Sequence, residues 1–188
     1  MVQARRAYVE AQKTLVVPSL VFLDEFGVQP GMNRLYGWSL CGRPPVITRQ
    51  VRAKRLNGVG AMALDGPRAL MTYTGSMDEA RMLEFVHDHL GPALNVGDTV
   101  VMDGLRVHTM ASVLAAIESY GATVLILPPY SPELNPIEMV WSVIKARLRA
   151  MGGVAWQELE STLRALWDTL EREFFPRWIK HCGYAQST

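Results

Sequence analysis

Three short apolar runs constrain the fold of this chain more than any other feature. Residues 20–23, 99–102 and 123–127 are continuous runs of apolar and β-branched residues, and two prolines stop the last one. Runs of this length, bounded by polar or turn-forming residues, are typical of buried strands. Between the second and third runs, residues 110–117 carry apolar side chains at helical spacing, which predicts a strand-helix-strand crossover and therefore a parallel pair.

A hairpin signal lies earlier in the chain. Residues 58–64 and 69–73 flank the dipeptide Asp65-Gly66, which is favoured in tight turns because both residues tolerate positive φ. We therefore predict an α/β fold with a mixed sheet, antiparallel in its first half and parallel in its second, and helices on both faces. Three further helices are expected: one capped by Ser76, one that begins at residues 135–136, and a last amphipathic one over residues 159–174.

Length and composition favour one soluble domain. The chain has 188 residues, which fits a single domain over residues 18–188 preceded by a helix or linker over residues 1–17. No apolar run approaches the roughly 20 residues of a membrane-spanning helix, and the first residues lack the apolar core of a signal peptide. Two distant cysteines argue against a disulfide framework and a cysteine-rich zinc site. We expect the protein in the cytoplasm, close to the nucleoid.

Positive charge is concentrated locally, although the net charge is only +1. One block without any acidic residue contains Arg43, Arg49, Arg52, Lys54 and Arg55. A second group consists of Lys145, Arg147 and Arg149. Local blocks can neutralise DNA phosphates in a nearly neutral chain, but each can equally be a solvated surface.

Asp24 and Asp103 each end an apolar run, and ligands of α/β sheets collect outside the carboxyl ends of strands. Each aspartate alone can also be a turn former. Glu138 follows a proline-rich segment, where Asn135, Pro136 and Glu138 form a capping-box pattern. Its place near a helix N-terminus also favours the ionised form that a hard cation needs. If the three carboxylates converge, they supply ligands for two Mg²⁺ ions about 4 Å apart, as in phosphoryl transfer.

Several motifs resemble the catalytic core of mariner-like insertion-sequence DDE transposases. They are residues 22–27 (FLDEFG), 101–103 (VMD), His108, 128–138 (PPYSPELNPIE), Trp141 and Lys145, together with the 34 residues between Asp103 and Glu138, the DD34E spacing. The likeness extends from roughly residue 4 to residue 185.

The resemblance implies an RNase H-like fold and cleavage and strand transfer of DNA that depend on Mg²⁺, with Mn²⁺ as a substitute. It implies Asp24, Asp103 and Glu138 as catalytic and metal-binding residues, with His108 and Lys145 as auxiliary groups. Lys145 follows Glu138 by seven residues, so both project from nearly the same side of a helix. The implied partner is double-stranded DNA, namely the transposon terminal repeats and the target. Pairing of two DNA ends suits a homodimer, although no heptad pattern is visible.

Two departures from the family pattern keep alternatives open. Gly104 stands where relatives usually have Asn directly after the second aspartate. The family's N-terminal helix-turn-helix region is expected to lie outside this chain. The alternatives are a catalytically inactive derivative that binds DNA or oligomerises, and an RNase H-like nuclease that only hydrolyses DNA.

Overall fold

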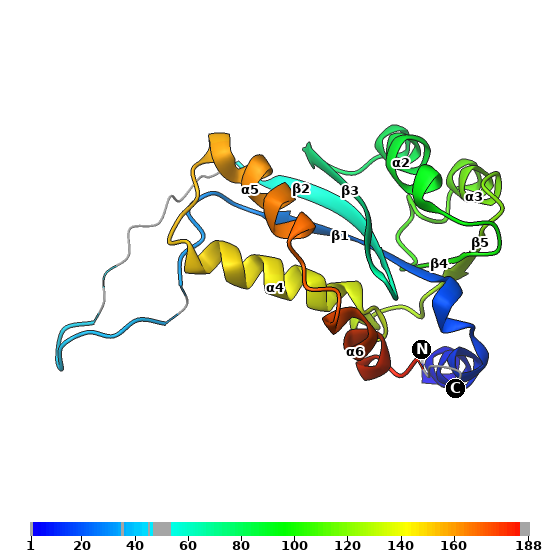
Figure 1. The fold of residues 1–188 in the computed structure, drawn as a ribbon, viewed down its shortest axis with the longest axis horizontal. Helices are drawn as coiled ribbons and strands as arrows, with labels where there is room; N and C mark the ends of the chain where they lie inside the picture. The colour runs from blue at the N-terminus through cyan, green and yellow to red at the C-terminus, as the bar shows by residue number, and fades with distance from the viewer. Residues whose placement is uncertain (1, 35, 45, 47–53, 185–188) are drawn as a thin grey trace.

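A computed structural model describes residues 2–34, 36–44, 46 and 54–184. Its centre is a five-stranded sheet with the strand order β3-β2-β1-β4-β5 (Figure 1). The strands are β1 (Leu20–Val28), β2 (Leu56–Ala63), β3 (Gly66–Thr74), β4 (Thr99–Met102) and β5 (Thr123–Ile126). β1, β2 and β3 pair antiparallel, whereas β1, β4 and β5 pair parallel. The predicted mixed sheet is therefore confirmed.

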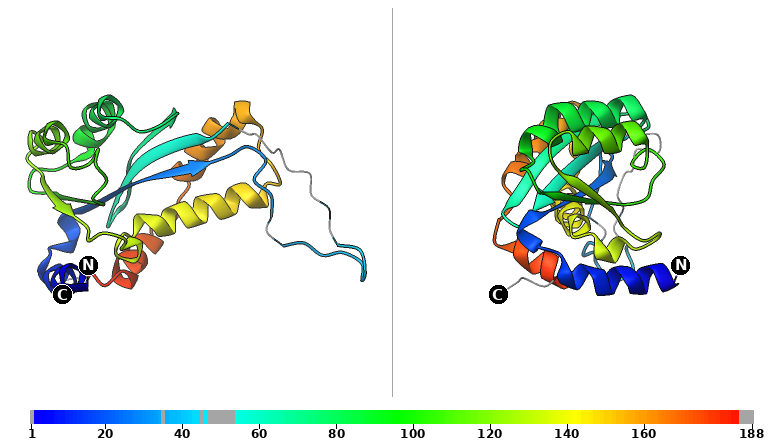
Figure 2. Two further views of the ribbon diagram at one scale, coloured as in Figure 1. Left: turned by 180° about the vertical axis from the view of Figure 1, so that it is seen from behind. Right: turned by 90° about the vertical axis from the view of Figure 1, so that its right-hand side faces the viewer.

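Helices cover both faces of the sheet (Figure 2). On one face lie α4 (Ile137–Ala150), α5 (Trp156–Asp168) and α6 (Phe174–His181), with α1 (Val2–Ala11) beside them. On the other face lie α3 (Ala111–Glu118) and α2 (Glu79–Phe85), which continues as a π-helical turn, η3 (Val86–Leu90). Short 3-10 helices occur at η1 (Gln12–Thr14), η2 (Val17–Ser19), η4 (Gly91–Ala93) and η5 (Pro132–Leu134).

The alternation of side chains along β1 divides the interior into two cores. Phe22 and Phe26 pack toward α4, where Phe26 stacks on Trp141 with ring centroids 4.1 Å apart. Val21 and Leu23 belong to the core under α2 and α3. Because successive side chains of a strand point to opposite faces, Asp24 belongs to the α4 side and Glu25 to the other. This parity places the acidic pair of β1 on two different faces.

β1 is longer than the sequence predicted. The apolar run 20–23 predicted a strand that ends at Asp24, but β1 continues to Val28. The parallel pairing with β4 stops at the pair Phe22–Val101, while the antiparallel pairing with β2 continues to the pair Val28–Leu56. Asp24 therefore lies within a strand, two residues beyond the point where the parallel neighbour ends.

Two helix boundaries also differ from the prediction. The N-cap of α2 is Asp78, not Ser76, and the Asp78 side chain accepts a hydrogen bond from the backbone N–H of Arg81. The single helix predicted over 159–174 is broken into α5 and α6. Pro176 prevents a single helix from continuing into α6, because proline lacks the N–H of a helix interior and its ring clashes with the carbonyl group four residues earlier, so it is tolerated only in a first turn. Restarting the helix at Phe174 places Pro176 in that turn.

Among the described residues, no helix is long and apolar enough to cross a membrane. The division into residues 1–17 and 18–188 stays a prediction. After β1 the chain leaves the sheet, and residues 36–44 extend away from the body of the molecule (Figure 1). Their apolar side chains, which include Tyr36, Trp38 and Leu40, are exposed.

Candidate active site

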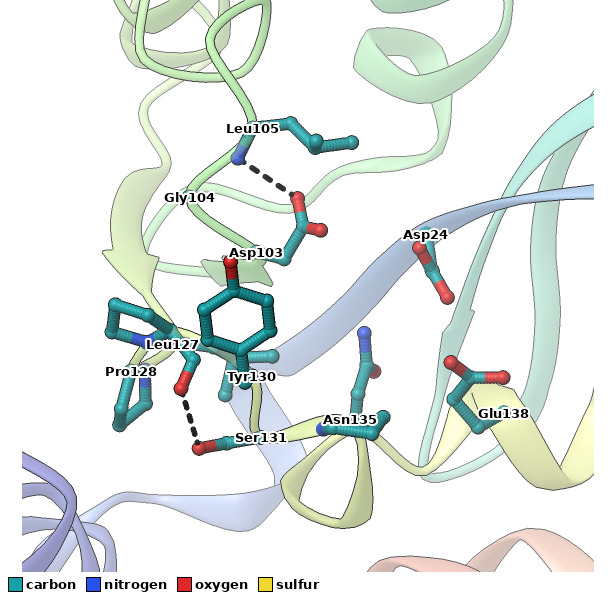
Figure 3. Close-up of a pocket in the computed structure, with 12 residues that line it drawn as sticks. Asp24, Asp103, Gly104, Leu105, Leu127, Pro128, Tyr130, Ser131, Asn135 and Glu138 are labelled. Atoms are coloured by element: carbon teal, nitrogen blue, oxygen red, sulfur yellow. Dashed lines mark hydrogen bonds between the residues drawn. The ribbon is translucent and has the colours of Figure 1, made fainter. Parts of the chain in front are cut away.

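A pocket of about 380 Å³ opens where β1, β4 and β5 meet the start of α4 (Figure 3). Its lining comes from residues 103–105, residues 127–132, and the side chains of Asp24, Asn135 and Glu138. Pockets of roughly 300–1,000 Å³ are the size of small-ligand sites. All three predicted carboxylates, Asp24, Asp103 and Glu138, therefore line the same pocket, although they come from distant parts of the chain.

The sheet register places the two aspartates close together. β1 and β4 run parallel and pair through Phe22 and Val101. Asp24 lies two residues after Phe22, and Asp103 lies two residues after Val101, directly beyond the end of β4. Equal offsets along parallel neighbours bring both side chains to the same edge and the same face of the sheet.

Glu138 reaches the pocket from the first turn of α4. The predicted capping box is wrong, because α4 has no side-chain cap and its N-cap residue is Pro136. The buried Asn135 side chain instead donates from Nδ2 to the carbonyl oxygen of Leu23, at 3.1 Å. This bond ties the start of α4 to β1, next to Asp24. Among the described residues, the Glu138 carboxylate makes no hydrogen bond, so it is not consumed by its own helix terminus.

Asp24 and Glu138 face each other across the pocket (Figure 3). Burial raises the pKa of Asp24, and the negative charges of Glu138 and Asp103 raise it further, to about 7. A hydrogen bond from the backbone N–H of Glu25 to Asp24 Oδ1, at 2.7 Å, opposes this rise without cancelling it. Asp24 resists ionisation because it is buried next to other negative charges and has no positive charge beside it. A cation bound in the pocket would supply that positive charge.

The carboxylate of Asp103, unlike those of Asp24 and Glu138, is held by a histidine, His108. The imidazole Nδ1 lies 2.6 Å from Asp103 Oδ1, and the same oxygen accepts the backbone N–H of Leu105 at 3.2 Å. Burial works to raise the pKa of Asp103, but the hydrogen bond and the charge of His108 outweigh it, and the pKa is lowered. The Asp103 carboxylate is therefore ionised and has one oxygen fixed.

His108 is fully buried between two carboxylates. Its Nε2 lies 3.3 Å from Glu25 Oε1, at ion-pair distance but without hydrogen-bond alignment. Burial lowers the pKa of His108, but the contacts with Asp103 and Glu25 outweigh it and raise the pKa to about 10. Glu25, whose side chain is 17% exposed, thus supports the imidazole from the second face of the sheet. Burial raises the pKa of Tyr73, and the negative charge of Glu25 raises it further, to about 12.

The three carboxylates suit a hard divalent cation chemically, because such ions prefer oxygen ligands. Within the described part of the chain, however, no three His, Cys, Asp or Glu side chains are already grouped closely enough to hold a metal ion. Figure 3 shows the reason: the Asp103 carboxylate is turned toward the Leu105 amide, while Asp24 and Glu138 point at each other. The residue types and charges fit a metal, while the assignment of metal ligands stays a prediction.

Two other predicted features have defined places. Gly104 lines the pocket, and a Cβ there would lie 3.5 Å from Ile126, so a side chain would fit without strain. Lys145 is half-buried on α4, does not line the pocket, and makes no ion pair or hydrogen bond with the described residues. Its neighbour Arg147 is paired with Glu171, at 2.5 Å. Within the second basic group, Arg147 is thus already neutralised.

The first basic block is only partly described. Arg49 and Arg52 lie outside the described residues. Arg43, Lys54 and Arg55 are exposed, and the Lys54 ammonium lies 5.9 Å from the centre of the Trp156 ring. Within the described part of the chain, none of the three forms an ion pair. A DNA-binding role for this block stays a prediction.

Comparison with known proteins gives the class of this fold and site. The family described as DDE superfamily endonuclease matches residues 19–161, which contain all three carboxylates. The chain therefore belongs to the DDE superfamily endonucleases, a family of enzymes. No curated protein matches the sequence.

Solved structures of Mos1 mariner transposase share the fold. The Mos1 mariner paired-end complex with Mn superposes with a TM-score of 0.80 at 17% identity, covering 96% of this chain and 57% of that chain. The catalytic domain of Mos1 mariner transposase has a TM-score of 0.71 at 15% identity, covering 96% of this chain and 85% of that chain. The predicted RNase H-like mixed sheet is thereby confirmed. The chain spans 57% of the longer Mos1 chain.

Sequence reasoning missed three residues of the pocket's surroundings. Glu25 directly follows Asp24 in the sequence, and nothing local shows that its side chain faces the opposite side of the sheet and meets His108. Asn135 was read as a helix cap, yet it binds a strand 112 positions away. Tyr130 belongs to the proline-rich motif without a predicted role, although the prolines and Ser131 around it are signals of a turn.

Proposed function

We propose that this chain is the catalytic domain of a transposase, which cleaves DNA at transposon ends and joins the cut strand to a target. Mg²⁺, with Mn²⁺ as a substitute, is held by Asp24, Asp103 and Glu138. The observation that carries the proposal is that three carboxylates from three separate segments line one pocket, in a member of the DDE endonuclease family. The raised pKa of Asp24 supports it, because the acidic pocket lacks a compensating positive charge.

Each residue of the pocket has a separate role in the proposed reaction. When bound, divalent metal ions supply Lewis-acid activation of the attacking oxygen and stabilise the leaving one. Asp24 and Glu138 present oxygens from opposite walls of the pocket. His108 holds one oxygen of Asp103, which leaves Oδ2 without a hydrogen bond among the described residues. The Glu25 carboxylate lies at ion-pair distance from the other ring nitrogen of His108 and favours its charged form, which supports the bond to Asp103.

Double-stranded DNA is the proposed substrate. The paired-end complex with left transposon end is a complex of Mos1, and we extend its kind of partner to this chain on the shared fold. Arg43, Lys54 and Arg55 are exposed, and their block, with Arg49 and Arg52, is proposed to contact phosphates. Such an enzyme would act near the nucleoid, and pairing of two ends favours a homodimer, which sedimentation with end DNA would test.

A strand-cleavage assay tests the proposal. The purified chain is incubated with supercoiled plasmid and with candidate terminal-repeat duplexes, in Mg²⁺ or Mn²⁺, and nicked and joined products are separated on gels. Asp24→Asn, Asp103→Asn and Glu138→Gln should each reduce the cleavage rate by more than about 100-fold, since loss of a ligand's supporting bond alone costs about 10–100-fold. Matched exposed changes, Asp88→Asn and Glu118→Gln, should leave the rate unchanged.

The products separate the competing functions. Cleavage that is followed by joined products supports a transposase. Cleavage by water alone, without joined products from pre-cleaved ends, supports the RNase H-like nuclease. DNA binding without any metal-dependent cleavage, in the chain and in Gly104→Asn alike, supports the inactive derivative and overturns the proposal.

A further inference from the structure

Tyr130 has an unusual backbone conformation beside the pocket. Its φ is +55°, and it is the one non-glycine residue with positive φ in the described part of the chain. Apart from Gly, and occasionally Asn or Asp, residues adopt this left-handed conformation only at a cost in free energy. Backbone strain of this kind clusters at ligand sites. The neighbouring backbone cannot easily relax, because Pro128 and Ser131 are buried and the Ser131 hydroxyl donates to the carbonyl oxygen of Pro129 at 3.3 Å.

The strained turn gains little for folding. The Tyr130 side chain is 88% exposed, so its ring buries almost no apolar surface, and its hydroxyl makes no hydrogen bond with the described residues. A ring that stabilised the fold would be buried, as Trp141 and Tyr184 are. Strain combined with exposure at the rim of a pocket therefore indicates binding and not packing.

The rim and the floor of the pocket have complementary chemistry. Leu105, 46% exposed, lines the same pocket as Tyr130, so two accessible apolar side chains stand on the Asp103 side of the pocket that the three carboxylates line (Figure 3). A matching ligand has a flat apolar face next to an anionic group that enters the acidic floor together with cations. A nucleotide has this combination, with the base for the rim and the phosphate for the floor.

We propose that Tyr130 stacks on an unpaired nucleobase next to the reacting phosphate. The inference rests on the proposed function. Within a duplex both faces of a base are covered by its neighbours, so an exposed ring can stack only on a base that is terminal or splayed out of the helix. Aromatic stacking of this kind tolerates any base, because every base has a π face. Tyr130 thus orients the nucleotide at the cleaved end and is not a reader of sequence.

The test uses the full 188-residue chain, Ca²⁺, and short duplexes with an unpaired end that carries 2-aminopurine at successive positions. The variants are Tyr130→Phe, which keeps the ring, and Tyr130→Gly, which removes the ring and also relieves the positive φ. Stacking should quench the fluorescence of one position in the unsubstituted chain and in Tyr130→Phe, and not in Tyr130→Gly. Affinity should fall by about 5- to 150-fold in Tyr130→Gly.

An abasic nucleotide at the quenched position is the matched control. On abasic DNA the unsubstituted chain and Tyr130→Gly should bind equally, because there is no base to stack. Melting temperatures should agree within about 3 °C, which excludes unfolding as the cause. Equal losses on abasic and normal DNA, or an unchanged quench in Tyr130→Gly, would overturn the stacking and leave the proposed function standing. No binding of any duplex by the unsubstituted chain would overturn both.

Discussion

Among the aspartates that the structure describes, Asp24 has a pKa raised far above the ordinary value of 3.8. Its pKa is about 7 because it is buried and faces the charge of Glu138. An acid with a raised pKa in the folded state stabilises the fold below its unfolded pKa and loses that contribution as the pH rises through the folded value. For Asp24 this window runs from its ordinary value of 3.8 to about 7. Without metal, the ionised pocket is therefore a source of instability at neutral pH.

Asp24→Asn should consequently stabilise the metal-free protein, by about 2–4 kcal/mol at pH 8 and by almost nothing at pH 4, since one pKa unit corresponds to about 1.4 kcal/mol. Asn keeps an acceptor for the Glu25 amide and carries no charge. Urea unfolding in EDTA at the two pH values measures this difference.

Glu138→Gln is the informative companion, because Glu138 is the second cause of the raised pKa. It should reduce the pH dependence of stability without abolishing it. Added Mn²⁺ should reverse the order, since a ligand bound to the native state stabilises the unsubstituted protein most. An Asp24→Asn effect that is identical at both pH values would contradict the raised pKa.

At this scale the sequence predicted which acids line the pocket but not what supports them. Asp24 and Asp103 could be found because each follows an apolar run. The support from Glu25 and His108 depends on the alternation of β1 and on a contact across the sheet. Neither is visible in the residues next to Asp103, so His108 could be named only from a resemblance.

Among the elements, α4 carries both the acid Glu138 and the amine of Lys145, two turns apart on one side. Lys145 makes no ion pair within the described part of the chain, whereas Arg147 on the same helix is paired with Glu171. The free ammonium lies about 10 Å along the axis from Glu138, at about 1.5 Å per residue. Under the proposed function, that distance suits a DNA phosphate beyond the reacting one.

Lys145→Ala should weaken DNA binding and reduce the slope of log affinity against log salt by about 1, while Lys145→Arg should preserve most of the binding. Filter binding or fluorescence anisotropy at several salt concentrations measures both. The dependence on Mg²⁺ should hardly change, because a phosphate contact does not hold the metal.

Lys13→Ala is the control, because it removes the same single positive charge at a distant site. Lys13 is paired with Glu10 and does not line the pocket. If the two alanine variants bind DNA alike, Lys145 is only a solvated lysine.

Local patterns predicted the elements best where one signal had no competitor. The β4 prediction has the same bounds as the strand, because a polar stretch precedes its apolar run and Asp103 follows it. The predicted end of β1 was wrong because the antiparallel partner β2 extends the strand beyond its apolar part. The α5–α6 break was missed because the apolar stripe continues through Leu170 and Phe174 while the backbone does not.

For the molecule as a whole, a chain of hydroxyl groups connects its two ends to the pocket. The hydroxyl groups of Tyr8 and Tyr184 lie 2.8 Å apart, and Tyr184 donates to the carbonyl oxygen of Leu134 at 2.8 Å. Tyr184 is fully buried and packs edge-on against Phe22, with ring centroids 4.9 Å apart. Leu134 directly precedes Asn135, so the C-terminal region supports the segment that leads into α4.

Tyr184→Phe should destabilise the protein by about 1–3 kcal/mol, because it leaves the Tyr8 hydroxyl and the Leu134 carbonyl buried without a partner. The melting temperature should fall by about 3–10 °C for a domain of this size. Adding Tyr8→Phe should recover part of the loss, since it removes one of the two unpaired groups. Urea unfolding of the single and double variants measures the coupling.

Tyr120→Phe is the matched control, since its hydroxyl donates to the carbonyl oxygen of His87 at an exposed site, at 3.3 Å. It should change the free energy of unfolding by less than about 0.5 kcal/mol. Equal effects of Tyr184→Phe and Tyr120→Phe would mean that the buried hydroxyl chain adds no stability.

The hydrogen bond from Asn135 to Leu23 separates two kinds of sequence change. Insertions or deletions among residues 129–133 fall before this bond, so they reshape the rim and leave Glu138 opposite Asp24. A residue gained or lost between Asn135 and Glu138 would shift the acid by about 1.5 Å and rotate it by about 100°. The number of residues between Asp103 and Asn135 can therefore vary without moving Glu138, whereas the number between Asn135 and Glu138 cannot. In a divergent copy, the count from this asparagine identifies the third acid more securely than the full interval.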